Sequence, residues 1–230
     1  MNARSVSLKR TIGSAIAAVF IFAAAVGSVY VLLRLFQIKN IIVSGDPAKV
    51  EVNAKQFVGN MIFFQSDAVI TQIKNDNPLI KTIEIRKHFP STLELVVYKR
   101  QPIARLQTST AIVGIDSEAI VTDVLGNDLA PVIQIDVPLV RMGQTIKDEG
   151  VKQAVEIIAG SQSFLHIRKI QNYETVSLQA RTQESNIFFP QKGDIRPILD
   201  TLQTLIMGFR IKGTMPKTID LRFDKPVVQF

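Results

Sequence analysis

The chain has 230 residues, of which 47% are apolar, and this is enough for one or two domains with buried cores. It contains no cysteine, which excludes disulfides, thiolate metal sites and a thiol nucleophile. The formal charge of +7 is partly concentrated in Arg4, Lys9 and Arg10, and the diffuse remainder is a poor indication of nucleic-acid binding.

The first predicted element is an uncharged apolar stretch from Thr11 to Leu33. As a helix it would be about 34 Å long, enough to cross a hydrocarbon core of about 30 Å. We predict a leader over 1–10 and a transmembrane helix over 11–34. A cleaved signal peptide is the alternative, because alanines at 23–25 suit a signal peptidase, but the apolar stretch continues beyond them and favours an anchor. The basic leader favours a cytoplasmic N-terminus.

A small α+β domain is predicted over residues 35–105, where the apolar period changes from continuous to alternating or helical. Its expected elements are a strand over 36–43, helices over 51–59 and 67–76, and strands over 79–87 and 92–99. This order predicts a small sheet with both helices on one face.

A second, mainly antiparallel β domain with two helices is predicted over residues 106–230. One helix carries a stripe of Val151, Ala154, Val155 and Ile158, and the other carries apolar residues spaced by three or four from Ile195 to Phe209. We assign both stripes to the core. Strands are expected near 132–137, 166–172, 175–181 and 185–190.

Three stretches carry the most specific motifs of the chain: IIVSG at 41–45, NPLIKTIEIRKHFPSTLELVVYKRQPIARL at 77–106, and KTIDLRFDKPVVQF at 217–230. Together they resemble the FtsQ/DivIB family of bacterial cell-division proteins. The resemblance implies an α+β protein with one transmembrane helix, a POTRA (polypeptide-transport-associated) domain of order β-α-α-β-β over 35–105, and an FtsQ-type β domain over 106–230.

Two departures from the family pattern are visible. Lys99 stands where the family usually has an acid, and Asp116-Ser117-Glu118 fill a turn, within 112–125, that usually contains glycine. The geometry of that hairpin is therefore left open.

The resemblance also implies a function. It predicts a non-catalytic, single-pass divisome scaffold of the cytoplasmic membrane at the septum, with its C-terminal domain outside the cytoplasm, that recruits septal peptidoglycan synthesis by binding FtsB/DivIC and FtsL. Family members bind this partner by strand addition at the terminal strand, with an arginine that pairs with an acid on the partner. The matching residues here are Arg222, Phe223, Val227, Val228 and Phe230.

Each of these assignments has a simpler alternative. Phe223 could pack the sheet, with Arg222 solvated. Lys99 and Arg100, a basic pair at a strand end, are a second candidate contact for other division proteins, although such pairs are usually solvated.

Rival functions remain for comparison. His88 and His166 have no neighbouring pattern of a triad or metal site, and the sequence has no glycine-rich phosphate loop. We therefore expect no catalytic residue, cofactor, metal or small-molecule substrate, although distant acids could assemble into a glycan hydrolase. The other alternative is a POTRA-containing transport or assembly factor that binds polypeptides by β-augmentation.

Overall fold

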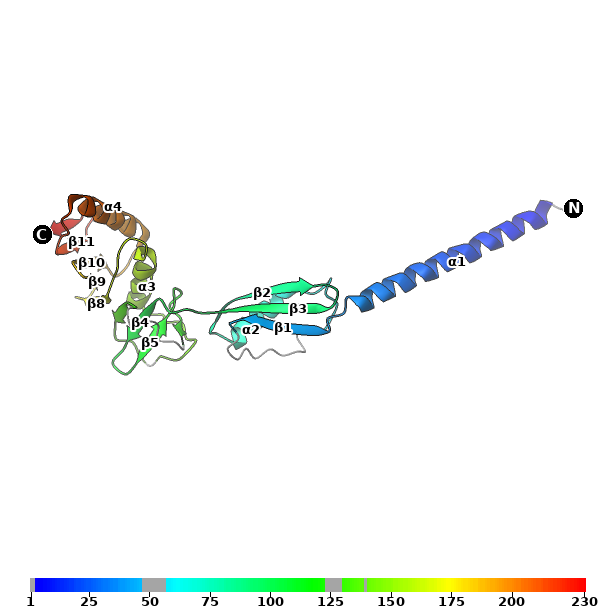
Figure 1. The fold of residues 1–230 in the computed structure, drawn as a ribbon, viewed down its shortest axis with the longest axis horizontal. Helices are drawn as coiled ribbons and strands as arrows, with labels where there is room; N and C mark the ends of the chain where they lie inside the picture. Colours follow the sequence, from blue (N-terminus) through cyan, green and yellow to red (C-terminus); the bar gives the residue numbers. More distant parts are fainter. Residues whose placement is uncertain (1–2, 47–56, 123–129, 139) are drawn as a thin grey trace. The chain divides into compact units, whose positions relative to one another are not determined.

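The computed structural model describes residues 3–46, 57–122, 130–138 and 140–230. It divides into two compact units, Met1–Tyr98 and Lys99–Phe230 (Figure 1). The expected boundary after residue 105 differs from this division, because it would cut through β4 (Ala104–Gln107), a strand that pairs within the second unit. Residues 51–56 of the helix expected over 51–59 lie outside the described residues.

The first unit begins with a long helix, α1 (Ala3–Leu35). Its segment Ala18–Leu35 has a mean hydropathy of 2.1, so the helix is long and apolar enough to cross a membrane. The helix starts well before the predicted residue 11. No proline or glycine stands between residues 3 and 10, so nothing there stops a helix from continuing toward the N-terminus.

The rest of the first unit is a small sheet with a helix. Its elements are β1 (Asn40–Gly45), α2 (Ser66–Asp76), β2 (Ile80–His88) and β3 (Thr92–Lys99). The strand order is β1-β3-β2, with β1 and β3 parallel. Leu93, Leu95 and Val97 alternate along β3 and are fully buried against Ile73 of α2. The three predicted strands and the helix predicted over 67–76 are confirmed, whereas residues 58 and 59, at the end of the other expected helix, are not helical.

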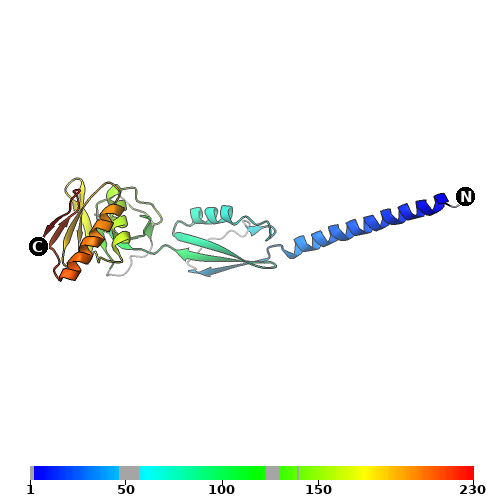
Figure 2. The same cartoon turned by 90° about the horizontal axis from the view of Figure 1, so that it is seen from above.

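The second unit contains two helices and a large sheet (Figure 2). Its elements are β4 (Ala104–Gln107), β5 (Ile112–Ile115), β6 (Val121–Thr122), β7 (Val132–Gln134), α3 (Glu149–Ser161), β8 (Lys169–Tyr173), β9 (Ser177–Arg181), β10 (Asn186–Pro190), α4 (Arg196–Lys212), β11 (Thr218–Asp220) and β12 (Val227–Gln229). The described strands form a nine-stranded sheet of order β12-β11-β10-β9-β8-β7-β4-β5-β6.

One face of this sheet carries the core. Residues in register across neighbouring strands form a continuous apolar row: Leu106, Ile133, Ile170, Ala180, Ile187, Ile219 and Val228. The stripes of α3 and α4 pack on this face, with Val155, Ile158, Leu202 and Ile206 buried in the same cluster. Both predicted core helices are therefore confirmed.

The sheet is mixed: five of its eight described strand pairs are antiparallel, in line with the prediction, and three are parallel. Among the described strands, β4 pairs with β7, β7 with β8, and β10 with β11 in parallel. Two of these pairs follow from the helices, because α3 joins β7 to β8 and α4 joins β10 to β11 as crossover connections.

Candidate partner-binding site

The C-terminal residues form two strands at one end of the large sheet. β11 is internal, since it pairs with β10 on one side and β12 on the other. β12 is the edge strand, and no described strand pairs with its outer side. The predicted site residues are therefore divided: Arg222 and Phe223 lie in the connection, Val227 and Val228 on the edge strand, and Phe230 directly after it.

The apolar row of the core face stops at Val228. This residue is in register with Ile219, which is fully buried, whereas Val228 is only partly buried. Alternate residues of an edge strand direct their N–H and C=O groups to the open side. A strand added beside β12 could therefore form main-chain hydrogen bonds and extend the apolar row by one residue.

Aromatic and apolar surface lies around this edge. Phe230 contacts Phe209 of α4 edge to face, with ring centroids 5.8 Å apart, yet Phe230 remains 65% exposed. Val227 and Phe223 are also exposed. Large apolar side chains that stay exposed beside a free strand are suited to contact another chain.

Arg222 is held by two acids of its own chain. Its guanidinium donates to both carboxylate oxygens of Asp220, with Nη2 2.7 Å from Oδ2 and Nε 3.0 Å from Oδ1. Its Nη1 donates to Oε2 of Glu174 at 3.1 Å. The hydrogen bond from Arg222 lowers the pKa of the Asp220 carboxyl below its usual value, and the same bond raises the pKa of Arg222.

Three aromatic rings surround the same guanidinium. Its carbon lies 5.3 Å from the ring centre of Phe188, 5.6 Å from that of Tyr173 and 5.7 Å from that of Phe223. These distances are within the range of cation–π attraction. The exposed ring of Phe223 therefore does not pack into the core, and it is positioned by Arg222.

Sequence reasoning did not find Glu174, Tyr173 or Phe188 as neighbours of Arg222. These residues lie on β10 and at the end of β8, far from Arg222 in the chain, and no local motif links them. The contact depends on strand order, because β11 pairs on one side with β10, a strand that α4 separates from it in the sequence. A carboxylate on a partner would have to compete with Asp220 for Arg222, so the predicted ion pair with a partner stays a prediction.

The second candidate contact, Lys99 and Arg100, lies at the start of the second unit. Arg100 is only 10% exposed, and its Nη1 donates to Oδ2 of Asp116 at 2.7 Å and to Oε2 of Glu118 at 2.6 Å. These bonds give Arg100 a role inside its own unit. A contact with other division proteins stays a prediction for this pair.

The turn after β5 forms a hairpin although it contains no glycine. Asp116 Oδ1 accepts hydrogen bonds from the backbone N–H groups of Glu118 and Ile120, each at 2.9 Å. Ala119 takes the left-handed conformation, with φ of 57°, that glycine would usually supply. β5 and β6 then pair antiparallel, and residues 123–125 of the expected hairpin lie outside the described residues.

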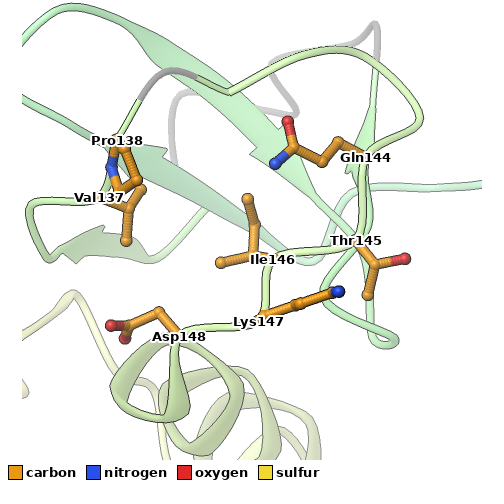
Figure 3. A pocket seen from close by; sticks show the side chains of 7 residues that line it. All are labelled: Val137, Pro138, Gln144, Thr145, Ile146, Lys147 and Asp148. Atoms are coloured by element: carbon orange, nitrogen blue, oxygen red, sulfur yellow. The ribbon is translucent and has the colours of Figure 1, made fainter.

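An open recess of about 580 Å³ lies beside the start of α3, lined by Val137, Pro138, Gln144, Thr145, Ile146, Lys147 and Asp148 (Figure 3). Lys147 and Asp148 point away from one another in this view (Figure 3). Asp148 Oδ1 accepts a hydrogen bond from the N–H of Val151 and caps α3. The described lining residues therefore bring together no acid and base for catalysis.

The two histidines lie in different units. His88 Nε2 is 2.7 Å from Oε2 of Glu94 at the β2–β3 hairpin, and His166 is exposed beside a second recess. Within the described part of the chain, no three His, Asp or Glu side chains are grouped to hold a metal ion. The expectation of a non-catalytic protein stays a prediction.

The chain was compared with models of known protein families and with curated proteins. No family model matches it. No curated protein matches it either. Its function is therefore inferred from the geometry of the β11–β12 edge and from the sequence motifs.

Proposed function

We propose that this protein is a single-pass, non-catalytic scaffold of the FtsQ/DivIB type, located in the cytoplasmic membrane at the division septum. Its α1 helix would anchor it, with the small sheet of the first unit and the whole second unit outside the cytoplasm. In this role it binds an FtsB/DivIC and FtsL pair and recruits septal peptidoglycan synthesis.

The free edge at β12 is the observation that carries this proposal. Val228 ends an apolar row that crosses the sheet, and its neighbours Val227 and Phe230 keep much of their surface exposed. An incoming strand gains affinity from main-chain hydrogen bonds and selectivity from side chains that alternate along the edge. The sequence resemblance identifies the same residues as the partner-binding strand.

In this proposal Arg222 contributes to binding indirectly, because it holds the edge strand in place. Its bonds to Asp220 and Glu174 fix the connection between β11 and β12, so the edge strand is presented in one conformation. An ordered edge has less conformational entropy to lose when a partner binds. A partner acid that approached Arg222 would add a third carboxylate to this network.

Substitution at the edge tests the proposal. Val228→Lys places a charge where an added strand would continue the apolar row. The control is Ile112→Lys, which places the same charge on an apolar strand residue of β5, near the opposite end of the sheet order. The assay is co-purification of the full chain in detergent with the FtsB/DivIC and FtsL proteins of the same genome.

We expect Val228→Lys to weaken binding at least about tenfold, as for a residue at the centre of an interface, and Ile112→Lys to leave it unchanged. Circular dichroism would check that both variants are folded. Binding that survives in a folded Val228→Lys variant would remove β12 from the interface. A wild-type chain that captures neither division protein would overturn the proposed function itself.

A further inference from the structure

The loop over residues 57–64 is hydrogen-bonded to the end of α1. Asn60 Nδ2 donates to the carbonyl oxygen of Leu33 at 2.8 Å, and the N–H of Met61 donates to the carbonyl oxygen of Phe36 at 2.8 Å. Gln37 and Asn60 also form an isolated β-bridge. Asn60 thus satisfies one of the last carbonyls of the helix, and the loop is fixed at this end of α1.

The loop is held in place by buried residues. Phe57 and Met61 are almost completely buried in the small core, and Phe64 stacks on Phe57 with ring centroids 5.9 Å apart. Lys87 Nζ, from β2, donates to the carbonyl oxygen of Met61 at 2.9 Å. The side chains between these anchors are therefore displayed on an ordered segment.

Four large apolar side chains remain exposed around this loop and at the tip of the β2–β3 hairpin. They form the membrane-proximal patch: Val58, Ile62, Phe63 and Phe89, exposed by 82%, 51%, 72% and 61%. The ring of Phe89 contacts that of Phe36, with centroids 5.7 Å apart, so the hairpin tip also lies at the end of α1. The segment 57–64 carries no charge. An exposed apolar cluster of this kind marks an interaction surface.

The position of the patch identifies what it contacts. The apolar segment of α1 ends at Leu35, so a bilayer crossed by this segment has its boundary near that residue. The loop contacts Leu33 and the hairpin tip contacts Phe36, so the patch lies at the level of this bilayer boundary. Arg34 lies over the ring of Tyr30 at 5.4 Å, a basic and aromatic pair suited to the headgroup region.

We propose that the membrane-proximal patch is inserted into the lipid interface of the bilayer that α1 crosses, and that it holds the first unit against the membrane surface. This inference depends on the membrane anchor of the proposed function. The ligand is the lipid itself, which buries the apolar side chains among headgroups and upper acyl chains. Docking of a second membrane protein on the patch is the competing outcome.

The absence of tryptophan from the sequence makes a direct test available. Single tryptophans are introduced into the full chain, reconstituted in phosphatidylcholine and phosphatidylglycerol vesicles with and without brominated acyl chains. Phe63→Trp and Val58→Trp report on the patch. Phe22→Trp reports on the anchor, since Phe22 lies in the apolar segment of α1. Tyr98→Trp is the control, because Tyr98 is partly exposed but lies about 20 Å along β3 from the hairpin tip.

We expect bromolipid to quench the tryptophans at 22, 58 and 63 about twofold or more, and to leave that at 98 unchanged, because the interface buries side chains only about 5–10 Å deep. Quenching at 22 without quenching at 58 and 63 would overturn the patch and leave the anchor intact; it is also the result expected if the patch binds a protein. Equal quenching at 63 and 98 would overturn this placement of the unit. An unquenched tryptophan at 22 would overturn the anchor, and the patch with it.

Discussion

Replacing Arg222 by alanine should destabilise the second unit measurably, although the side chain lies near the surface. The substitution removes the bidentate hydrogen bonds to Asp220, the bond to Glu174 and the cation–π contacts with the rings around the guanidinium. Asp220 keeps only the backbone N–H of residue 222 as a donor from this network.

The expected loss follows from the exposure of the pair. The side chain of Arg222 is 24% exposed and that of Asp220 is 14% exposed, so the pair is neither buried nor fully solvated. A hydrogen bond to a charged group contributes about 1.5–3 kcal/mol, and an exposed cation–π contact about 0.5–1 kcal/mol. Solvent screening reduces the sum. We therefore expect Arg222→Ala to lower the free energy of opening by about 2 kcal/mol.

Arg86 offers a matched control, because it pairs with Glu84 at the same two-residue spacing. Both of those side chains are about half exposed, so Arg86→Ala should change stability much less than Arg222→Ala does. Hydrogen exchange measured by mass spectrometry on the full chain reports on peptides from each unit separately. If Arg222→Ala proves as harmless as Arg86→Ala, the observed contacts do not stabilise the sheet edge.

Three further predictions concern stability. The depressed pKa of Asp220 contributes stability that is complete above its unfolded pKa of about 3.9 and is lost as the pH falls through the lower folded value. Wild type should therefore lose thermal stability more steeply below about pH 4 than the Asp220→Asn variant does, as measured by circular dichroism. Gly45→Ala should cost about 2 kcal/mol or more by hydrogen exchange, because φ is +93° and the new Cβ would meet the backbone of β3, whereas Gly213→Ala, at φ +71° in open space, should cost about 1 kcal/mol. Arg100→Met should cost about 3 kcal/mol in the same measurement, since Asp116 is 1% exposed and would lose its cation.

The helices could be predicted because their signal is local. Val151 and Ile158 in α3, like Leu202 and Ile206 in α4, recur at the helical period, and all four are buried in the core. This periodicity is a property of one segment and does not depend on the fold of the rest of the chain. The buried residues of both helices could therefore be predicted without knowledge of the sheet.

The sheet order could not be predicted in the same way. The parallel pairing of β10 with β11 brings Phe188 beside Asp220, although α4 separates the two strands in the chain. A residue pattern along one strand does not specify its neighbour, because any apolar strand would satisfy the same alternation. Glu174, Tyr173 and Phe188 were missed as neighbours of Arg222 for this reason. The edge residues Val227 and Val228 were predicted from the motif alone.

The network around Arg222 also bears on how a three-residue edge strand could bind a partner. β12 is too short to offer many main-chain hydrogen bonds, so in the proposed function its affinity for a partner would depend on its being ordered beforehand. Arg222 supplies that order by tying the β11–β12 connection to Glu174 on the far side of β10. If position is its role, Arg222→Lys, which loses the bidentate geometry, should reduce partner binding in proportion to the loss of exchange protection in residues 218–230. If Arg222 instead pairs directly with a partner acid, lysine should preserve much of the binding while protection falls.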